Sequence, residues 1–181
     1  MRALFARCEN RNVEAWLICD HRFQRRFGLG HAKPWPLPIG SALRSGYLKR
    51  GAPIEALAAS CGIDASALAR TVTEFNRHAH EGRDPEFGRG ETPYDRMQGD
   101  VEHRGANPCV APIEHGPFYA VRIVPGSLGT FAGLSVNQHA QVLNAHDAPI
   151  NGLYAAGNDA SSVMGGHYPS GGITLGPALV F

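Results

Sequence analysis

The residues best suited to chemistry lie in a glycine-rich stretch near the end of the chain. A short apolar run over residues 153–156 predicts a buried strand, which Gly157 and Asn158 would end in a turn. A helix is expected to begin near Thr174, with Pro177 in its first turn, where the missing N–H has no partner to lose. Glycine is dense between these elements, at Gly165, Gly166, Gly171, Gly172 and Gly176. The backbone N–H groups of such a stretch can face an electron-rich ligand, and a purely structural glycine loop is the alternative.

Four other side chains could take part in chemistry, but a structural role is favoured for each. His78 and His80 resemble a metal pair, yet residues two apart on a helix point in different directions, so no metal site is expected there. Their charge would instead complement the C-terminus of their helix. Arg89 could bind an anion, but a salt bridge within its loop is favoured. Trp35 could form a ligand wall, but packing over its proline-rich loop is favoured.

The composition is that of an ordinary globular protein. The chain has 181 residues, 43% of them hydrophobic, which suits one domain or two partial ones. Its 17 Lys and Arg residues nearly balance its 16 Asp and Glu residues, so neither nucleic acid nor an anionic membrane is expected as a partner. No apolar run reaches the roughly 20 residues of a membrane span, and the apolar part of the first residues is too short for a secretory signal.

The cysteines are widely spaced and form no C-x-x-C motif. They stand at Cys8, Cys19, Cys61 and Cys109. This pattern favours reduced thiols over disulfides, and with them a cytoplasmic protein.

Hydrophobic spacing and punctuating residues predict helices, strands and polar loops before about residue 128. Strands are expected at 14–19 and 116–124, helices at 21–27, 54–61 and 65–79, and loops at 31–40 and 81–105. Asp64 is the expected N-cap of the longest helix, and Gly62 the residue that ends the helix before it. The loop over 81–105 is too long for an idle connection, so we expect it to pack as an ordered surface loop.

Strands and glycine dominate after residue 128, and we place a domain boundary at this shift in composition. Residues 126–133 form a second loop of small residues. Strands at 134–136 and 141–143 are expected to pair, with residues 144–148 as the following turn. No internal repeat is visible.

The glycine-rich stretch resembles a known family. Its motifs are Gly152-Leu-Tyr-Ala-Ala-Gly-Asn158, Met164-Gly165, Tyr168-Pro-x-Gly-Gly172 and Leu175-Gly-Pro-Ala178. Together they are similar to the C-terminal end of the flavoproteins that include fumarate reductases, succinate dehydrogenase flavoproteins and 3-ketosteroid Δ1-dehydrogenases. The similarity is closest to the ketosteroid dehydrogenase branch. It is strong over residues 117–181 and looser, but continuous, over residues 14–116.

The resemblance implies an α/β fold in two parts. Residues 1–128 would be part of a capping domain over the substrate, and residues 129–181 the C-terminal piece of a Rossmann-like FAD-binding domain. The family's pyrophosphate motif, G-x-G-x-x-G, has no counterpart, because Gly28 and Gly30 are followed by Lys33 at the third glycine position. We therefore expect the C-terminal portion of a longer FAD-dependent enzyme, inactive without the N-terminal residues that complete its site.

The resemblance also assigns residues to the catalytic and cofactor sites. In the ketosteroid branch a tyrosine hydroxyl and a backbone N–H donate to the substrate carbonyl, and the matching residues are Tyr168 and Gly172. These donors would stabilise charge on that oxygen while a neighbouring hydride passes to flavin N5. The residues expected to bind FAD are Gly157, Asn158, Thr174, Leu175, Gly176 and Pro177. The family's basic tyrosine has no counterpart, since Tyr47 and Tyr94 lack the right context.

Two alternatives to a dehydrogenase of a ketone, such as a 3-ketosteroid, stay open. Fumarate reductase-like members hold their substrate with a His and an Arg, and Gly129 and Tyr168 stand at those positions here. A tyrosine cannot replace the fork of an arginine, so such a protein would need another substrate. The second alternative is a non-enzymatic remnant that binds no flavin by itself. The sequence departs from the family pattern at Ala132, Asn137, Ala148 and Ser170, and a serine would strain the loop if residue 170 needs a positive φ.

Overall fold

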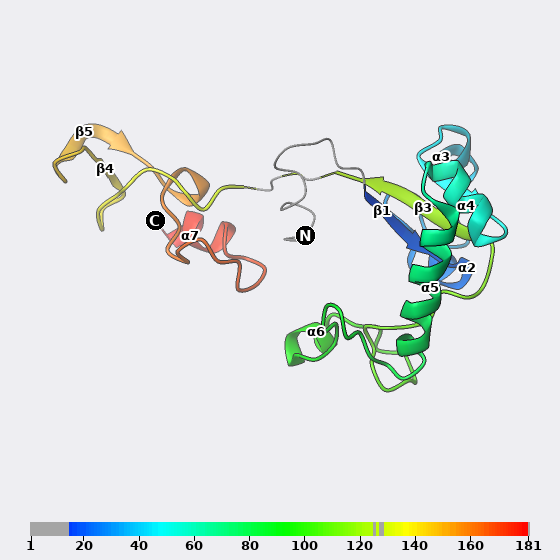
Figure 1. The fold of residues 1–181 in the computed structure, drawn as a ribbon. Coiled ribbons are helices and arrows are strands. Elements are labelled where there is room, and N and C mark those ends of the chain that lie inside the picture. Colours follow the sequence, from blue (N-terminus) through cyan, green and yellow to red (C-terminus); the bar gives the residue numbers. More distant parts are fainter. Residues whose placement is uncertain (1–14, 125, 127–128, 181) are drawn as a thin grey trace. The chain divides into compact units, whose positions relative to one another are not determined.

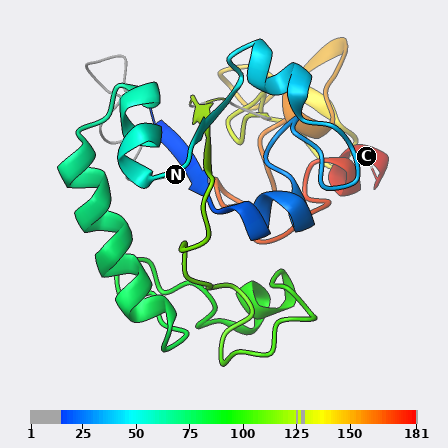
Figure 2. The same cartoon turned by 90° about the vertical axis from the view of Figure 1, so that its right-hand side faces the viewer.

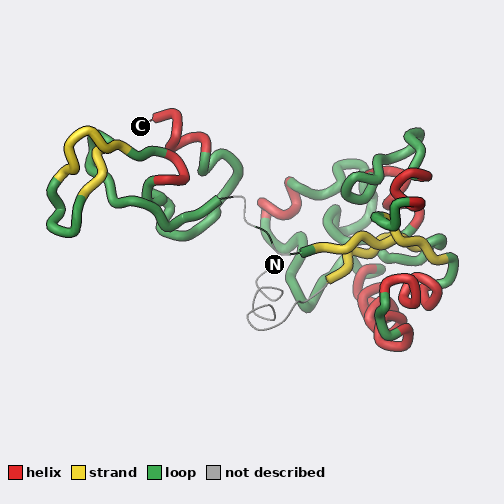
Figure 3. Tube along the Cα trace, turned by 90° about the horizontal axis from the view of Figure 1, so that it is seen from above, coloured by secondary structure: helices red, strands yellow, loops and turns green. Residues whose placement is uncertain are grey.

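The computed structural model describes residues 15–124, 126 and 129–180. Contacts within the chain divide it into two compact units, Met1–Val124 and Pro125–Phe181 (Figure 1). Both units contain helices and strands (Figure 3), in agreement with the fold class expected from the sequence. The assignment of 1–128 to a capping domain and 129–181 to an FAD-binding domain stays a prediction.

The first unit is built on a three-stranded antiparallel sheet. Strand β3 (Phe118–Ile123) lies between β1 (Ala15–Cys19) and β2 (Leu48–Gly51). The register places Tyr119 opposite Cys19 on one side and opposite Arg50 on the other. The strands predicted at 14–19 and 116–124 are confirmed within the described residues, with β3 shorter at both ends than predicted.

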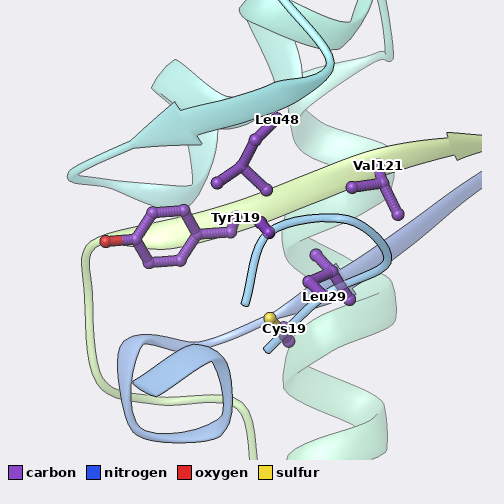
Figure 4. Close-up of a cluster of buried hydrophobic side chains, with 6 residues drawn as sticks. Cys19, Leu29, Leu48, Tyr119 and Val121 are labelled. Carbon is purple, nitrogen blue, oxygen red and sulfur yellow. The ribbon is translucent and has the colours of Figure 1, made fainter. Parts of the chain in front are cut away.

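Each face of this sheet packs against a different part of the chain. One face carries the buried cluster of Figure 4, which contains Cys19, Leu29, Ala32, Leu48, Tyr119 and Val121. Helix α4 (Ile54–Cys61) covers the other face, where Leu57 and Ala120 are fully buried. A side chain at Gly51 would lie 2.2 Å from the backbone nitrogen of Leu57, so the helix can approach β2 only because this residue is glycine.

Local capping residues define the helices, and the caps predicted at Gly62 and Asp64 are confirmed. Helix α2 (His21–Phe27) begins after Asp20, whose carboxylate accepts the Phe23 N–H at 2.9 Å. Helix α5 (Ala65–Ala79) begins after Asp64, and Gly62 ends α4 in the left-handed region with φ 67°. These predicted helices are confirmed to the residue. A short helix that was not predicted, α3 (Gly40–Arg44), follows the proline-rich loop.

The polar stretch after α5 is ordered, as expected. It contains one short helix, α6 (Pro93–Met97), and Figure 2 shows α5 extending from the sheet toward this region. The Asn107 side chain donates to the carbonyls of Gly82 and Arg89, which ties distant turns of the loop together. Arg26 connects the loop to α2 through ion pairs of 2.7 Å to Asp100 and Glu102.

The second unit is small and has little core. Strands β4 (Gln141–Leu143) and β5 (Pro149–Tyr154) pair through the predicted turn, in which the Asn144 carboxamide oxygen accepts two backbone N–H groups. The predicted pairing of 134–136 with 141–143 is reduced to a single bridge between Val136 and Val142. The strand predicted over 153–156 is present at Leu153 and Tyr154, but the prediction that it is buried and continues to residue 156 was wrong, because β5 ends at Tyr154 and is exposed along its length. The buried cluster described in this unit is small and consists of Val142 of β4, Ala155 and Ala160, with Val136 packed against them.

The cysteines that the structure describes are free thiols, at Cys19, Cys61 and Cys109, whereas Cys8 lies outside the described residues. Burial, together with a smaller contribution from the charge of Asp20, raises the pKa of the Cys19 thiol to about 12. Among the described helices, none is both long and apolar enough to cross a membrane.

We expect Leu57→Ala to lower the free energy of unfolding by about 2–5 kcal/mol, because it empties a fully buried site between α4 and the sheet. Leu37→Ala is the matched control, since Leu37 is 57% exposed and its loss should change stability by less than about 0.5 kcal/mol. Urea unfolding followed by circular dichroism measures both values. Equal losses in the two variants would contradict this account of the core.

Cys19 should resist alkylation in the folded protein at about pH 8, near the ordinary pKa of a thiol, because its raised pKa leaves almost no thiolate. A raised folded pKa also means that the folded state loses stability as the pH rises above the unfolded thiol value, roughly 8.5. Mass spectrometry after iodoacetamide treatment, with and without urea, measures the protection. Rapid labelling of Cys19 without urea would contradict it.

Candidate functional site

Two loops of the second unit lie side by side and form the base of the candidate site. One precedes β4, and the other begins with the short helix η1 (Gly157–Asp159), which follows β5. Leu134 donates to the Asp159 carbonyl at 2.8 Å and accepts from the Ser161 N–H at 2.9 Å. Ser162 donates to the Phe131 carbonyl at 3.1 Å. These bonds form a short parallel pairing, which joins segments that the sequence separates by a hairpin.

A pocket of about 360 Å³ lies on these two loops and the start of helix α7 (Leu175–Val180). Its lining combines apolar side chains with hydroxyl and carboxamide groups. The lining residues are Thr130, Phe131, Ser135, Val136, Asn137, Gln138, Gly157, Asn158, Ala160, Ser161, Ser162, Val163, Ile173, Thr174 and Pro177. All of them belong to the second unit.

The structure brings four of the six predicted cofactor residues together in this pocket: Gly157, Asn158, Thr174 and Pro177. The other two, Leu175 and Gly176, lie on α7, where Leu175 is 68% exposed. The Asn158 side chain packs against Gly129 so closely that a Cβ there would lie 2.5 Å from its amide nitrogen. Glycine at position 129 therefore leaves room for Asn158 in the pocket wall.

Gly157 is required by both its conformation and its packing. Its φ of 62° lies in the left-handed region, which side chains other than glycine rarely adopt. A Cβ on this residue would also lie 2.9 Å from the Cβ of Ala178, where α7 packs against η1. The pocket therefore requires glycine at position 157, where η1 begins after β5.

The predicted catalytic residues lie beside the pocket rather than in its wall. The Tyr168 ring is 58% exposed and meets the Phe131 ring edge-on, with centroids 6.2 Å apart at an angle of 82°. Phe131 lines the pocket, so Tyr168 stands next to that side of it. Gly172 has a φ of 93° and precedes the lining residue Ile173. Its carbonyl accepts the Gly176 N–H at 2.7 Å, which connects the glycine loop to α7.

The departures from the family pattern are accommodated without strain at Ser170. Among the described residues, the positive φ values outside glycine occur at Ala140 and Asp147, and Ser170 is not one of them. Asn137 accepts the N–H groups of His139 and Gln141 through its carboxamide oxygen, a role that a carboxylate oxygen could also fill.

The other side chains singled out in the sequence make local contacts in the first unit. Arg89 pairs with the buried carboxylate of Asp84, so the predicted salt bridge is confirmed. His78 and His80 contact Glu74 and Glu114, respectively. The described residues hold no cluster of three or more side chains suited to a metal ion.

Trp35 does not pack over its loop as predicted. Its ring is 64% exposed, and the Arg25 guanidinium lies 5.1 Å from the ring centroid. The two tyrosines considered as bases also belong to the first unit, where the Tyr47 hydroxyl accepts the His31 N–H at 3.0 Å and Tyr94 is half-exposed.

Sequence reasoning missed several residues that line the pocket, above all Phe131, Ser162 and Ile173. Phe131 lies in the small-residue loop over 126–133, and small residues there allow the second loop to approach. A side chain at Gly133, for example, would lie 2.5 Å from the Ala160 carbonyl. The density of small residues over 126–133 was therefore the sequence signal that could have indicated this loop pairing.

Comparison with known families matches residues 1–175 to the family described as FAD binding domain. The chain belongs to this family. FAD is accordingly its cofactor, as the resemblance to the flavoproteins implies.

Individual relatives agree with the predicted branch of the family. The 4-oxocyclohex-2-ene-1-carboxylate 5-dehydrogenase of Sinomonas cyclohexanicum is 48% identical over 166 residues, which cover 92% of this chain and 28% of that protein. The 3-oxosteroid 1-dehydrogenase of Mycolicibacterium smegmatis is 40% identical over 170 residues, or 94% of this chain and 30% of that protein. A crystal structure of 3-ketosteroid Δ1-dehydrogenase from Sterolibacterium denitrificans, in complex with 1,4-androstadiene-3,17-dione, matches with a TM-score of 0.83 at 41% identity. That match covers 92% of this chain and 30% of the other.

The pocket is small for a cofactor site. Ligand sites commonly measure roughly 300–1,000 Å³, and about 360 Å³ lies at the lower end. Hydroxyl and carboxamide groups from Thr130, Asn158 and Thr174 can pair with polar atoms of a ring system, while Phe131 and Pro177 offer apolar faces. The chain spans only about 30% of its relatives' length, which accords with a partial site.

Gly157→Ala should lower the free energy of unfolding by about 1–3 kcal/mol more than Gly152→Ala. Both glycines have positive φ, but only the Cβ at 157 would meet α7, whereas the space around residue 152 is open. The difference between the variants therefore isolates the contact beneath the pocket. Urea unfolding measures it, and equal effects would show that α7 does not pack there.

Proposed function

We propose that this chain supplies the carbonyl-binding side of an FAD-dependent dehydrogenase that acts on a ring ketone. The observation that carries the proposal is the position of Tyr168, beside a pocket whose wall contains Gly157, Asn158 and Thr174. In this proposal residues 1–128 belong to a capping domain and residues 129–181 to an FAD-binding domain.

The proposed roles of Tyr168 and Gly172 follow from the charge that develops during the reaction. Removing a proton next to a ketone places negative charge on the carbonyl oxygen, and donors aimed at that oxygen stabilise it. The Tyr168 hydroxyl would donate one hydrogen bond and the Gly172 N–H a second. Among the described residues, neither the Tyr168 hydroxyl nor the Gly172 N–H has a hydrogen-bond partner. Bound FAD would supply the hydride acceptor at N5.

The proposed substrate carries a ketone in a six-membered ring. The relatives named above are dehydrogenases of 3-oxosteroids and of a 4-oxocyclohexene carboxylate, so a cyclic ketone is what their names share. A 3-ketosteroid is one such substrate. A dicarboxylate is less suitable for the second unit, because the sequence has no Lys or Arg after Arg122.

A second candidate is a chain that neither binds flavin nor catalyses a reaction by itself. The exposed apolar surface of the second unit favours it, since Leu153, Val163, Leu179 and Val180 are all more than two-fifths exposed. The visible spectrum of the purified chain distinguishes the candidates. A colourless protein that takes up no added FAD would support the second candidate for the chain alone.

The dehydrogenase proposal is best tested in a chimera, in which this chain replaces the matching segment of its 48% identical relative. Tyr168→Phe in that chimera should lower kcat by roughly 10²–10³, because one donor to the developing oxyanion is lost. FAD affinity should stay unchanged, since the ring and its contact with Phe131 remain. Steady-state turnover of a cyclic ketone with an artificial electron acceptor measures the effect.

Tyr154→Phe is the matched control, because Tyr154 is 61% exposed on β5 and has no proposed role in the reaction. Its turnover should stay within about twofold of the parent. If Tyr168→Phe also stays within that range, Tyr168 has no catalytic role.

A further inference from the structure

A row of three side chains crosses one face of the first unit's sheet. Cys19, Tyr119 and Arg50 are opposite one another in the antiparallel register, and directly opposite residues point to the same face. Tyr119 is only 2% exposed. Figure 4 shows its hydroxyl directed away from Leu29 and Val121, toward the margin of the buried cluster. Arg50 is exposed, so the row ends in a cation at the surface.

Helix α2 brings a second arginine to the same tyrosine. The His21 ring stacks on the Tyr119 ring, and its Nδ1 lies 3.3 Å from the Tyr119 hydroxyl. Arg25 follows His21 by four residues and therefore lies on the same helix face. Its guanidinium packs over the exposed ring of Trp35, which holds it in place. Burial raises the pKa of Tyr119, and the charges of Arg50 and Arg25 both oppose that shift.

Neither arginine is neutralised by a carboxylate among the described residues. The acidic residue nearest to Arg25 in sequence is Asp20, and its two oxygens accept the N–H groups of Phe23 and His115. Within the part of the chain that the structure describes, Asp20 pairs with Arg22, at 3.8 Å. The neighbouring Arg26, by contrast, already contacts two carboxylates. The charge at Arg25 and Arg50 is thus available to a ligand.

We propose that the first unit binds the carboxylate of a small ring-bearing organic acid at Arg25 and Arg50, beside the Tyr119 hydroxyl. Guanidinium groups match the planar geometry of a carboxylate, and the exposed face of Trp35 offers apolar contact to the rest of the acid. Every Lys and Arg of the chain stands at or before Arg122, so an acidic ligand finds its permanent side-chain cations in this unit. The site goes beyond the proposed dehydrogenation and requires no flavin.

The test uses the complete 181-residue chain without FAD, and cyclohexanecarboxylate as the probe. Titration followed by calorimetry or by NMR should show saturable binding that weakens as salt is added. Arg25→Gln and Arg50→Gln should each raise the Kd by roughly tenfold or more, because each removes a charged donor. Arg70→Gln is the matched control, since Arg70 is an exposed arginine on α5, and it should leave the Kd unchanged.

Two further ligands make the test specific. Cyclohexanecarboxamide, the neutral isostere, should bind far more weakly than the acid, and inorganic phosphate should compete poorly, because it lacks an apolar body. The proposal fails if the acid shows no saturable binding, if the amide or phosphate binds as well, or if Arg70→Gln weakens binding equally. Circular dichroism checks that the exposed substitutions leave the fold intact. If the chain binds the carboxylate but its chimera shows no turnover, the dehydrogenase proposal fails and the proposal of a carboxylate site stands.

Discussion

The close approach of two loops in the second unit is the constraint on which the candidate site depends. A side chain at Gly133 would overlap the backbone of Ala160, and one at Gly129 would overlap the Asn158 amide. Because these residues are glycines, the backbone bonds around Leu134 can form and hold the loops together. The pocket, and the position of Tyr168 against Phe131, both follow from that contact.

A different interaction organises the first unit, namely the packing of both sheet faces around its central strand. Ala120 is fully buried beneath α4, while Tyr119 and Val121 face the opposite cluster. Because successive side chains of β3 point to opposite faces of the sheet, this one strand contributes to the buried clusters on both faces. Tyr119, near the start of the same strand, places its hydroxyl beside His21 of α2 and lies opposite Arg50 of β2, where a buried core meets a charged surface.

The sequence predicts those features that depend on neighbouring residues. Helices α2 and α5 begin where Asp20 and Asp64 supply caps, and α4 ends where Gly62 permits a left-handed turn. The site was predictable only in part. Family motifs identify residues of the glycine loop, but the lining by Phe131 depends on a loop pairing that no local pattern encodes. The exposure of β5 was missed because an apolar run does not reveal how many strands lie beside it.

The distribution of charge suits a reaction in which charge appears only transiently. The second unit contains no Lys or Arg, so the donors proposed for the carbonyl oxygen are a neutral phenol and a backbone N–H. A permanent cation at that point would also bind a ligand that is charged throughout, such as a dicarboxylate, and would stabilise its ground state. Neutral donors interact weakly with a ketone and more strongly with the oxyanion that forms from it, and only this difference lowers the barrier. A tyrosine at position 168, where the resemblance to fumarate reductases implies an arginine, therefore suits the proposed chemistry at a ketone, where the charge must be created during the reaction.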